Sequence, residues 1–262
     1  MSGSGRWSDL ALRVATGLVM ACVGLGAVWA GGWVFITFVA ILSGLIAWEL
    51  AAMLAPGQRG FALQTGAATG LAGYCAIWGP AAAVVPTLLV PVVVGWFALP
   101  EQRRIFIPFL LLILVASFGM SSVRDSFGMM WMAWLICVVA ATDIAGYFAG
   151  RLIGGPKLWP RVSPKKTWSG TSAGWIAAAF VGLAFMGVLG AGAWLAVLSV
   201  ATSVASQAGD LAQSAVKRRA GVKDSSNLLP GHGGVFDRFD GMIAASALVL
   251  AVMQTTGYPP GP

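Results

Sequence analysis

Nine apolar stretches dominate the sequence, and each is close to the length of a helix that crosses a lipid bilayer, about 20 residues. They cover 12–30, 33–54, 61–79, 81–99, 105–120, 127–149, 172–189, 191–212 and 239–256. None shows the alternation of polar and apolar residues that is typical of a membrane β-strand. Only 10% of the 262 residues are charged, against about 25% in a soluble domain. We therefore expect an all-α integral membrane protein with about nine transmembrane helices.

The basic residues indicate how these helices are oriented, because Lys and Arg collect on the cytoplasmic side of a membrane. With a cytoplasmic N-terminus, 15 of the 16 Lys and Arg fall in inner segments, and only Arg124 falls outside. The C-terminal tail is then external. The first stretch is interpreted as a permanent helix, since no convincing signal-peptide cleavage site follows it. The 105–120 stretch is short enough to be a tilted or re-entrant segment.

We divide the chain into an N-terminal region with helices 1–5 (residues 1–120) and a C-terminal catalytic region (121–262). The second region carries two basic cytoplasmic connections, 150–171 and 213–238. Topology alone places Lys and Arg there, and anionic lipids attract them. However, Gly-Gly-Pro, Ser-Pro-Lys-Lys-Thr and His-Gly-Gly interrupt the charges. Gly allows close approach of a ligand to the backbone, and Ser, Thr and Lys donate to phosphate oxygens, so a phosphate site is also predicted.

Five acidic residues belong to the predicted helices or enter them from the cytoplasmic side. Glu49, Asp143 and Asp210 lie near the inner ends of three helices, and Asp237 and Asp240 are spaced i,i+3 at the start of the last one. An ionisable residue in a membrane helix costs about 2.5–3.5 kcal/mol on insertion scales, so each is a candidate for function. Any one of them could instead be a snorkelling helix-end residue or an ion-pair partner. Together they predict a site for Mg²⁺ and polyphosphate at one membrane surface.

Other cofactor chemistries lack support. Cys22, Cys75 and Cys137 lie singly in three stretches, with no C-x-x-C pair, so neither a zinc site nor a redox pair is predicted. No Walker A motif occurs. The net charge of +7 is explained by the inner membrane surface, and no nucleic-acid partner is expected.

The segment 214–240, SAVKRRAGVKDSSNLLPGHGGVFDRFD, resembles the signature of the phosphatidate cytidylyltransferases, also called CDP-diacylglycerol synthases. The matching residues are Ser214, Lys217, Arg218, Lys223, Asp224, Pro230, His232, Gly233, Gly234, Asp237, Arg238 and Asp240. Upstream, TDIAGYFAGRLIGG and SPKKTWSG are similar to further inner segments of the family, with Asp143, Tyr147, Gly150, Arg151, Ser163, Pro164, Lys165, Lys166 and Thr167 aligned. Ser169 departs from the acidic residue that is common there, and Ala145-Gly146 replaces Gly-Ala. The resemblance covers roughly the C-terminal half.

The resemblance implies the reaction CTP + phosphatidate → CDP-diacylglycerol + pyrophosphate in phospholipid biosynthesis, with Mg²⁺ as cofactor and room for a second cation. Together with the depth of the carboxylates, it implies Asp210 and Asp237 as principal metal ligands and Asp143 and Asp240 as supporting ones. The expected catalytic residues are Asp210, Asp237, Lys217 and Asp240. The expected substrate-binding residues are Tyr147, Ser163, Lys165, Lys166, Ser214, Arg218, Lys223, His232, Gly233, Gly234 and Arg238.

The resemblance also implies CTP and bilayer phosphatidate as partners, a homodimer, and a multi-pass protein of the bacterial inner membrane with its active site facing the cytoplasm. Two alternatives are weaker. A CDP-alcohol phosphatidyltransferase needs two further Asp after its D-x-x-D-G opening, and no acidic residue follows Asp240. A transporter would place its carboxylates near the bilayer midplane and show duplicated halves, neither of which is found.

Overall fold

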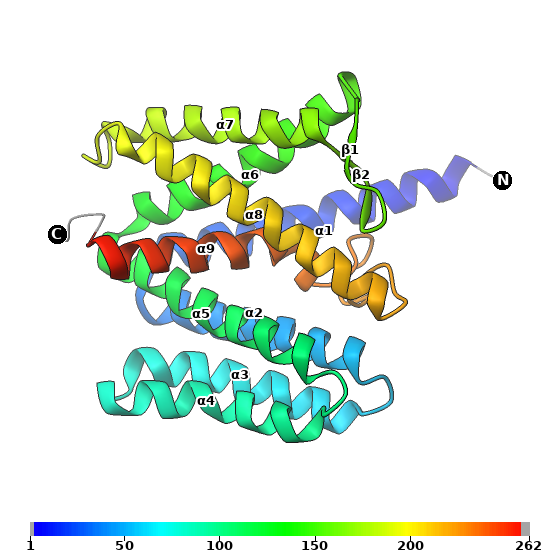
Figure 1. Ribbon diagram of the computed structural model, residues 1–262, viewed down its shortest axis with the longest axis vertical. Coiled ribbons are helices and arrows are strands. Elements are labelled where there is room, and N and C mark those ends of the chain that lie inside the picture. The colour runs from blue at the N-terminus through cyan, green and yellow to red at the C-terminus, as the bar shows by residue number, and fades with distance from the viewer. Residues whose placement is uncertain (1–2, 258–262) are drawn as a thin grey trace. The chain divides into compact units, whose positions relative to one another are not determined.

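The computed structural model describes residues 3–257, and this part of the chain forms nine α-helices and one two-stranded sheet (Figure 1). The helices are α1 (Gly3–Ala30), α2 (Gly32–Leu54), α3 (Arg59–Trp78), α4 (Ala81–Ala98), α5 (Arg103–Phe127), α6 (Met129–Leu152), α7 (Trp168–Met186), α8 (Trp194–Arg219) and α9 (Phe236–Thr256). The strands are β1 (Lys157–Trp159) and β2 (Ser163–Thr167). The fold is helical as predicted. The end of the predicted external tail, 258–262, lies outside the described residues.

Seven helices of the described part are long and apolar enough to cross a membrane, which agrees with a multi-pass membrane protein. Helices α3 and α4 do not reach this length and hydropathy. The apolar part of α4, Ala82–Ala98, is shorter than the rest, and this helix contains Pro86 and Pro91. Nine crossings and a cytoplasmic N-terminus therefore stay predictions.

Helix α5 is longer than its predicted stretch, 105–120. It runs for 25 residues, and its last turns include the polar segment SSVRDS, which lowers the local hydropathy without ending the helix. Ser121 in this segment is only 2% exposed, so it packs inside the protein. The helix ends before Gly128, whose positive φ of 88° separates α5 from α6. The short stretch is thus part of a full-length helix.

The chain packs as two compact units, each described by itself. The first comprises residues 1–114 and 220–239, and the second comprises 115–219 and 240–262. In the first unit α2 packs against α3 through glycines. A Cβ on Gly44 would lie 2.8 Å from the carbonyl oxygen of Gly66, and a Cβ on Gly66 would lie 2.8 Å from that of Gly44. Such contacts require small residues, as is common between membrane helices.

In the second unit α6, α7 and α8 pack together, with the hairpin at one end of the three helices (Figure 1). Buried hydrogen bonds join α6 to α8. The Trp134 indole donates to Ser199 Oγ at 2.9 Å, and the Thr142 hydroxyl donates to Ser203 Oγ at 2.8 Å. These pairs satisfy polar groups that lie away from water. The division of function at residue 120 stays a prediction.

The β1–β2 hairpin lies within the first basic connection and was not predicted. Its strands are antiparallel, with Lys157 opposite Thr167 and Trp159 opposite Ser163. Thr167 is also the N-cap of α7, since its hydroxyl oxygen accepts a hydrogen bond from Gly170 N at 3.2 Å. The hairpin therefore places Lys165 and Lys166 beside the start of α7.

Candidate functional site

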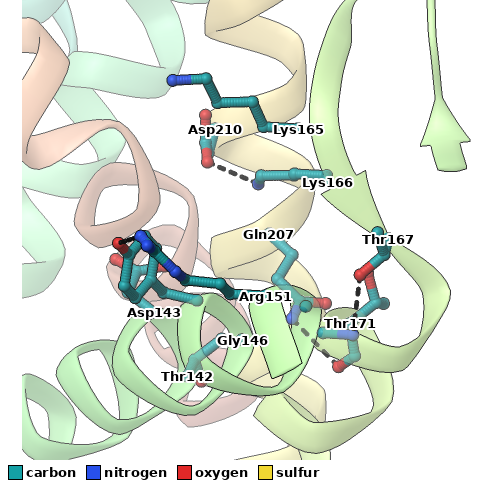
Figure 2. Close-up of a pocket in the computed structure, with 13 residues that line it drawn as sticks. Thr142, Asp143, Gly146, Arg151, Lys165, Lys166, Thr167, Thr171, Gln207 and Asp210 are labelled. Atoms are coloured by element: carbon teal, nitrogen blue, oxygen red, sulfur yellow. Dashed lines mark hydrogen bonds and ion pairs between the residues drawn. The ribbon is translucent and has the colours of Figure 1, made fainter. Parts of the chain in front are cut away.

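A cavity of 490 Å³ opens in the second unit between α6, β2, α7 and α8 (Figure 2). We call it the hairpin pocket. Five of the predicted site residues line it, and they are Asp143, Tyr147, Lys165, Lys166 and Asp210. The other lining residues are Thr142, Gly146, Gly150, Arg151, Thr167, Gly170, Thr171 and Gln207. Residues from the first basic connection and from three apolar helices thus meet at one hollow.

An ion pair in the hairpin pocket joins the hairpin to α8. Lys166 Nζ lies 2.5 Å from Asp210 Oδ2, with the two side chains 24% and 31% exposed. The Ser214 hydroxyl, one turn further along α8, donates to Asp210 Oδ1 at 3.2 Å. Figure 2 shows Lys165 near the same carboxylate, without an ion pair drawn to it. The pocket therefore holds cations beside an anion, which suits a ligand that carries both phosphate and metal.

The wall of the pocket between α6 and α7 is built from small residues. A Cβ on Gly170 would lie 2.5 Å from the carbonyl oxygen of Gly146, so the two helices touch along their backbones there. A Cβ on Gly150 would lie 2.9 Å from the Thr167 hydroxyl oxygen. The alignment of Gly150 and Thr167 with the family segments therefore has a packing reason in this chain.

Gln207 is a pocket residue that the sequence analysis missed. Its amide accepts a hydrogen bond from the Trp175 indole at 2.9 Å and donates to the carbonyl oxygen of Thr171 at 3.1 Å, which ties α8 to α7 (Figure 2). A signal was present, because Gln207 lies three residues before Asp210 and so on the same helical face.

Asp240 and Lys217 are predicted site residues of the second unit that do not line the hairpin pocket. Asp240 interacts electrostatically with Asp210, Lys217 and Asp143, and its Oδ1 accepts a hydrogen bond from Gly241 N at 2.7 Å. Lys217 is 9% exposed, which is low for a lysine. Three carboxylates and a buried ammonium group therefore influence one another in this unit. The metal-binding roles of Asp143, Asp210 and Asp240 stay predictions.

The carboxylates of the second unit can be tested for their fit to Mg²⁺. Among the described residues, no three His, Cys, Asp or Glu side chains gather closely enough to hold a metal ion. Mg²⁺ does not need such a cage, because it is usually held by one or two carboxylates with water and substrate phosphates. The oxygen donors of Asp210 and Asp240 are of the type that Mg²⁺ prefers. The residues present thus fit the ion in kind.

Residues 220–238 of the second basic connection pack in the first unit, around Glu49 of α2. We call residues 220–235 the signature loop. Glu49 is completely buried and accepts four hydrogen bonds from the loop and the start of α9. Its Oε1 accepts from Ser226 Oγ at 2.6 Å and Val235 N at 2.9 Å. Its Oε2 accepts from Ser225 Oγ at 2.8 Å and Phe236 N at 2.7 Å.

Asp237 organises the same loop from α9. Its Oδ2 accepts hydrogen bonds from Ser225 N at 2.8 Å, Ser225 Oγ at 3.0 Å and Gly234 N at 2.9 Å. One oxygen of this carboxylate is therefore committed to the loop backbone. The role of Asp237 as a principal metal ligand stays a prediction.

Several predicted phosphate-binding residues have partners within the first unit. The Arg238 guanidinium donates to the carbonyl oxygen of His232 through Nε at 3.1 Å and a terminal nitrogen at 2.8 Å. Gly233 has a positive φ of 85°, and a Cβ there would lie 2.9 Å from Asp237 Oδ2. A Cβ on Gly234 would lie 2.6 Å from both Glu49 oxygens. The two glycines are thus required by the neighbouring carboxylates of Asp237 and Glu49, whatever they do for a ligand.

The remaining predicted residues lie partly or fully at the surface. Ser163 is the first residue of β2, Arg218 is exposed in the last turn of α8, and Lys223 is exposed in the signature loop. Tyr147 is exposed and accepts a hydrogen bond from Arg151 at 2.9 Å. The convergence of all five carboxylates on one site stays a prediction, because Glu49 and Asp237 belong to the first unit and the others to the second.

Comparison with known proteins extends the similarity beyond the C-terminal half. A model of the cytidylyltransferase family matches residues 11–256. The chain is 39% identical to the phosphatidate cytidylyltransferase of Brucella suis over 255 residues, which is 92% of each chain. It is 44% identical to that of Haemophilus influenzae over 125 residues, 45% of this chain and 43% of the relative. It is 39% identical to that of Bacillus subtilis over 122 residues, 45% of each. The first five helices are therefore included in the likeness.

Proposed function

Since the chain belongs to the cytidylyltransferase family and is an enzyme, we propose that it converts CTP and phosphatidate to CDP-diacylglycerol and pyrophosphate. A phosphate oxygen of the lipid attacks the α-phosphorus of CTP. The bond from that phosphorus to the bridging oxygen breaks, and pyrophosphate leaves with the bonding electrons. The attacking oxygen is already ionised, so no strong general base is required. This suits a chain with one His among its 262 residues.

The observation that carries this proposal is the pairing of Lys166 with Asp210 in the hairpin pocket, beside Lys165. Both reactants are polyanions, so the enzyme must mainly position them and neutralise their charge. Lys165 and Lys166 are placed to bind phosphate oxygens from the hairpin, and the glycine-lined wall leaves space for the ligand. Asp210 counterbalances the lysines until the ligand arrives.

Mg²⁺ is part of the proposal, held by Asp210 with Asp240 and Asp143 in support. Bound there, the ion would neutralise charge on the phosphate oxygens in the transition state. Asp240 also interacts electrostatically with the buried Lys217. Ser214 orients the Asp210 carboxylate through its hydrogen bond. The protein groups thus set the charge balance of the pocket before either substrate binds.

The distribution of basic residues also supports a location for the enzyme. We place it in the bacterial inner membrane, with the hairpin pocket facing the cytoplasm, because 15 of the 16 basic residues fall on the inner side of the predicted topology. Phosphatidate would enter from the bilayer, and CTP from the cytosol. A homodimer is proposed from the family resemblance.

The direct test uses the purified full chain in liposomes that contain phosphatidate. With labelled CTP and Mg²⁺, we expect labelled CDP-diacylglycerol and one pyrophosphate for each lipid converted. Omitting phosphatidate is the control for CTP hydrolysis. If the protein were folded and inserted yet formed no CDP-diacylglycerol, the proposal would be wrong.

A further inference from the structure

Glu49 is a buried carboxylate that the proposed chemistry does not use. We propose that it is a positioning residue, which clamps the signature loop to α2 and so fixes the conformation of the segment that carries His232 and Lys223, the residues expected to bind phosphate. This inference rests on the proposed function, because it assigns the loop to substrate binding. It extends that function to a residue of α2, far from the signature in sequence.

Glu49 accepts too many hydrogen bonds from the protein to be a helix-end residue whose carboxylate reaches water. A buried carboxylate is costly unless it is fully hydrogen-bonded. Glu49 is 0% exposed, and each of its oxygens accepts one hydroxyl and one backbone N–H. The two N–H groups belong to Val235 and Phe236, at the start of α9, where the helix dipole also favours a negative charge. The site is therefore complete without any bound ligand.

The four donors lie at the two ends of one segment. Ser225 and Ser226 precede it, and Val235 and Phe236 close it. A single carboxylate thus brings together points ten residues apart along the chain. Between them, His232 N donates to the carbonyl oxygen of Leu229 at 2.9 Å, which adds a tight turn within the closed loop. The loop is held at its base, as compact Ω-loops are.

Gly234 provides an independent observation. It is buried, and a Cβ there would overlap Ser225 Oγ and lie 2.6 Å from both carboxylate oxygens of Glu49. Any other residue at this position would push Ser225 or the carboxylate aside and so break the contact between Glu49 and the loop. The second glycine of the His-Gly-Gly motif is thus explained by Glu49 and its donor Ser225, without a substrate contact.

Ser225 couples the clamp to Asp237. Its hydroxyl lies 2.8 Å from Glu49 Oε2 and 3.0 Å from Asp237 Oδ2, and it has one proton to donate. The two carboxylates therefore hold the loop through a shared group. They also hold different backbone N–H groups, since Asp237 accepts from Ser225 and Gly234 while Glu49 accepts from Val235 and Phe236.

Because Glu49 and Asp237 accept from different backbone N–H groups, amide hydrogen exchange on the full chain in detergent can test the role of each carboxylate. Glu49→Gln replaces one acceptor oxygen with a donor, so we expect exchange at Val235 and Phe236 to accelerate about tenfold. Asp237→Asn should instead accelerate Ser225 and Gly234. Glu101→Gln is the matched control, because Glu101 is the only other glutamate and is exposed. Unchanged exchange in Glu49→Gln would overturn the clamp.

Kinetics then test the positioning role. In Glu49→Gln and Gly234→Ala we expect the KM for CTP to rise about tenfold, with a smaller fall in kcat. Partial unfolding alone would lower kcat and leave KM unchanged, and that result would overturn the inference. If Glu49→Gln did not insert, Ser226→Ala removes only one donor and should raise KM by a smaller factor. An inactive wild-type protein would reject the proposed function, while the exchange comparison would still decide whether Glu49 holds the loop.

Discussion

Lys166 of the β hairpin and Asp210 of α8 form an ion pair, with 2.5 Å between Nζ and Oδ2 (Figure 2). The pair is partly exposed, so water still reaches it and it adds little to the free energy of unfolding. The pair matters for ligand binding, because both residues line the hairpin pocket. A phosphate ligand would compete for Lys166, and a cation would compete for Asp210. We expect substrate binding to rearrange this pair.

Asp210→Asn should lower the rate of CDP-diacylglycerol formation about a hundredfold or more, since it removes the charge that balances the lysines and supports the metal. The measurement is turnover of labelled CTP in liposomes. Asp125→Asn is the control, because Asp125 is exposed at the end of α5. Turnover of Asp210→Asn close to the control would remove Asp210 from the site.

Lys166→Met should raise the KM for CTP about tenfold, since a methionine has similar length but cannot donate to phosphate. The matched variant is Lys157→Met, which changes an exposed lysine on the other strand of the hairpin. Steady-state kinetics at saturating phosphatidate check this. Equal KM values in the two variants would contradict a phosphate role for Lys166.

Gly170→Ala should destabilise the second unit by about 1–3 kcal/mol, because the added methyl group would overlap the carbonyl oxygen of Gly146 and force α6 from α7. Gly187→Ala is the control, since nothing lies within 4 Å of a Cβ at that position. Thermal unfolding in detergent, followed by circular dichroism, measures both. An unchanged Tm for Gly170→Ala would show that the two helices separate without cost.

Chelation with EDTA should abolish turnover and leave the helical content unchanged, and added Mg²⁺ should restore activity. Asp240→Asn should raise the Mg²⁺ concentration for half-maximal activity about tenfold, because an amide nitrogen replaces one of the two oxygen donors that could bind the ion. A Mg²⁺ titration of wild-type and variant protein measures this effect. Full activity in EDTA would exclude a metal requirement.

The helices could be predicted because a membrane helix has a strong signal, a run of apolar residues long enough for the bilayer. The prediction was wrong in length for α5, where the polar segment SSVRDS after residue 120 interrupts the hydropathy but not the helix. The β hairpin was missed for the opposite reason. It is short, polar and mostly exposed, so neither hydropathy nor period-two alternation marks it.

The candidate site was partly predictable for a related reason. Asp143, Lys165, Lys166 and Asp210 are charged residues beside or inside apolar stretches, and they do line one pocket. Gln207 was missed because an uncharged polar residue hardly changes the hydropathy of a stretch. Its hydrogen bonds to two residues of α7 become visible only when the helices are packed.

The sequence by itself determined that this chain is a helical membrane protein of the cytidylyltransferase family, because apolar runs and signature residues are local patterns. Only the tertiary structure decided which groups of the protein pair with the charged residues. Glu49 accepts the N–H of Phe236 at 2.7 Å although 187 positions separate them. No spacing rule links such residues, since their contact depends on how α2 packs against the signature loop. The partners of a buried charge are chosen by packing, where an unpaired charge is too costly to remain.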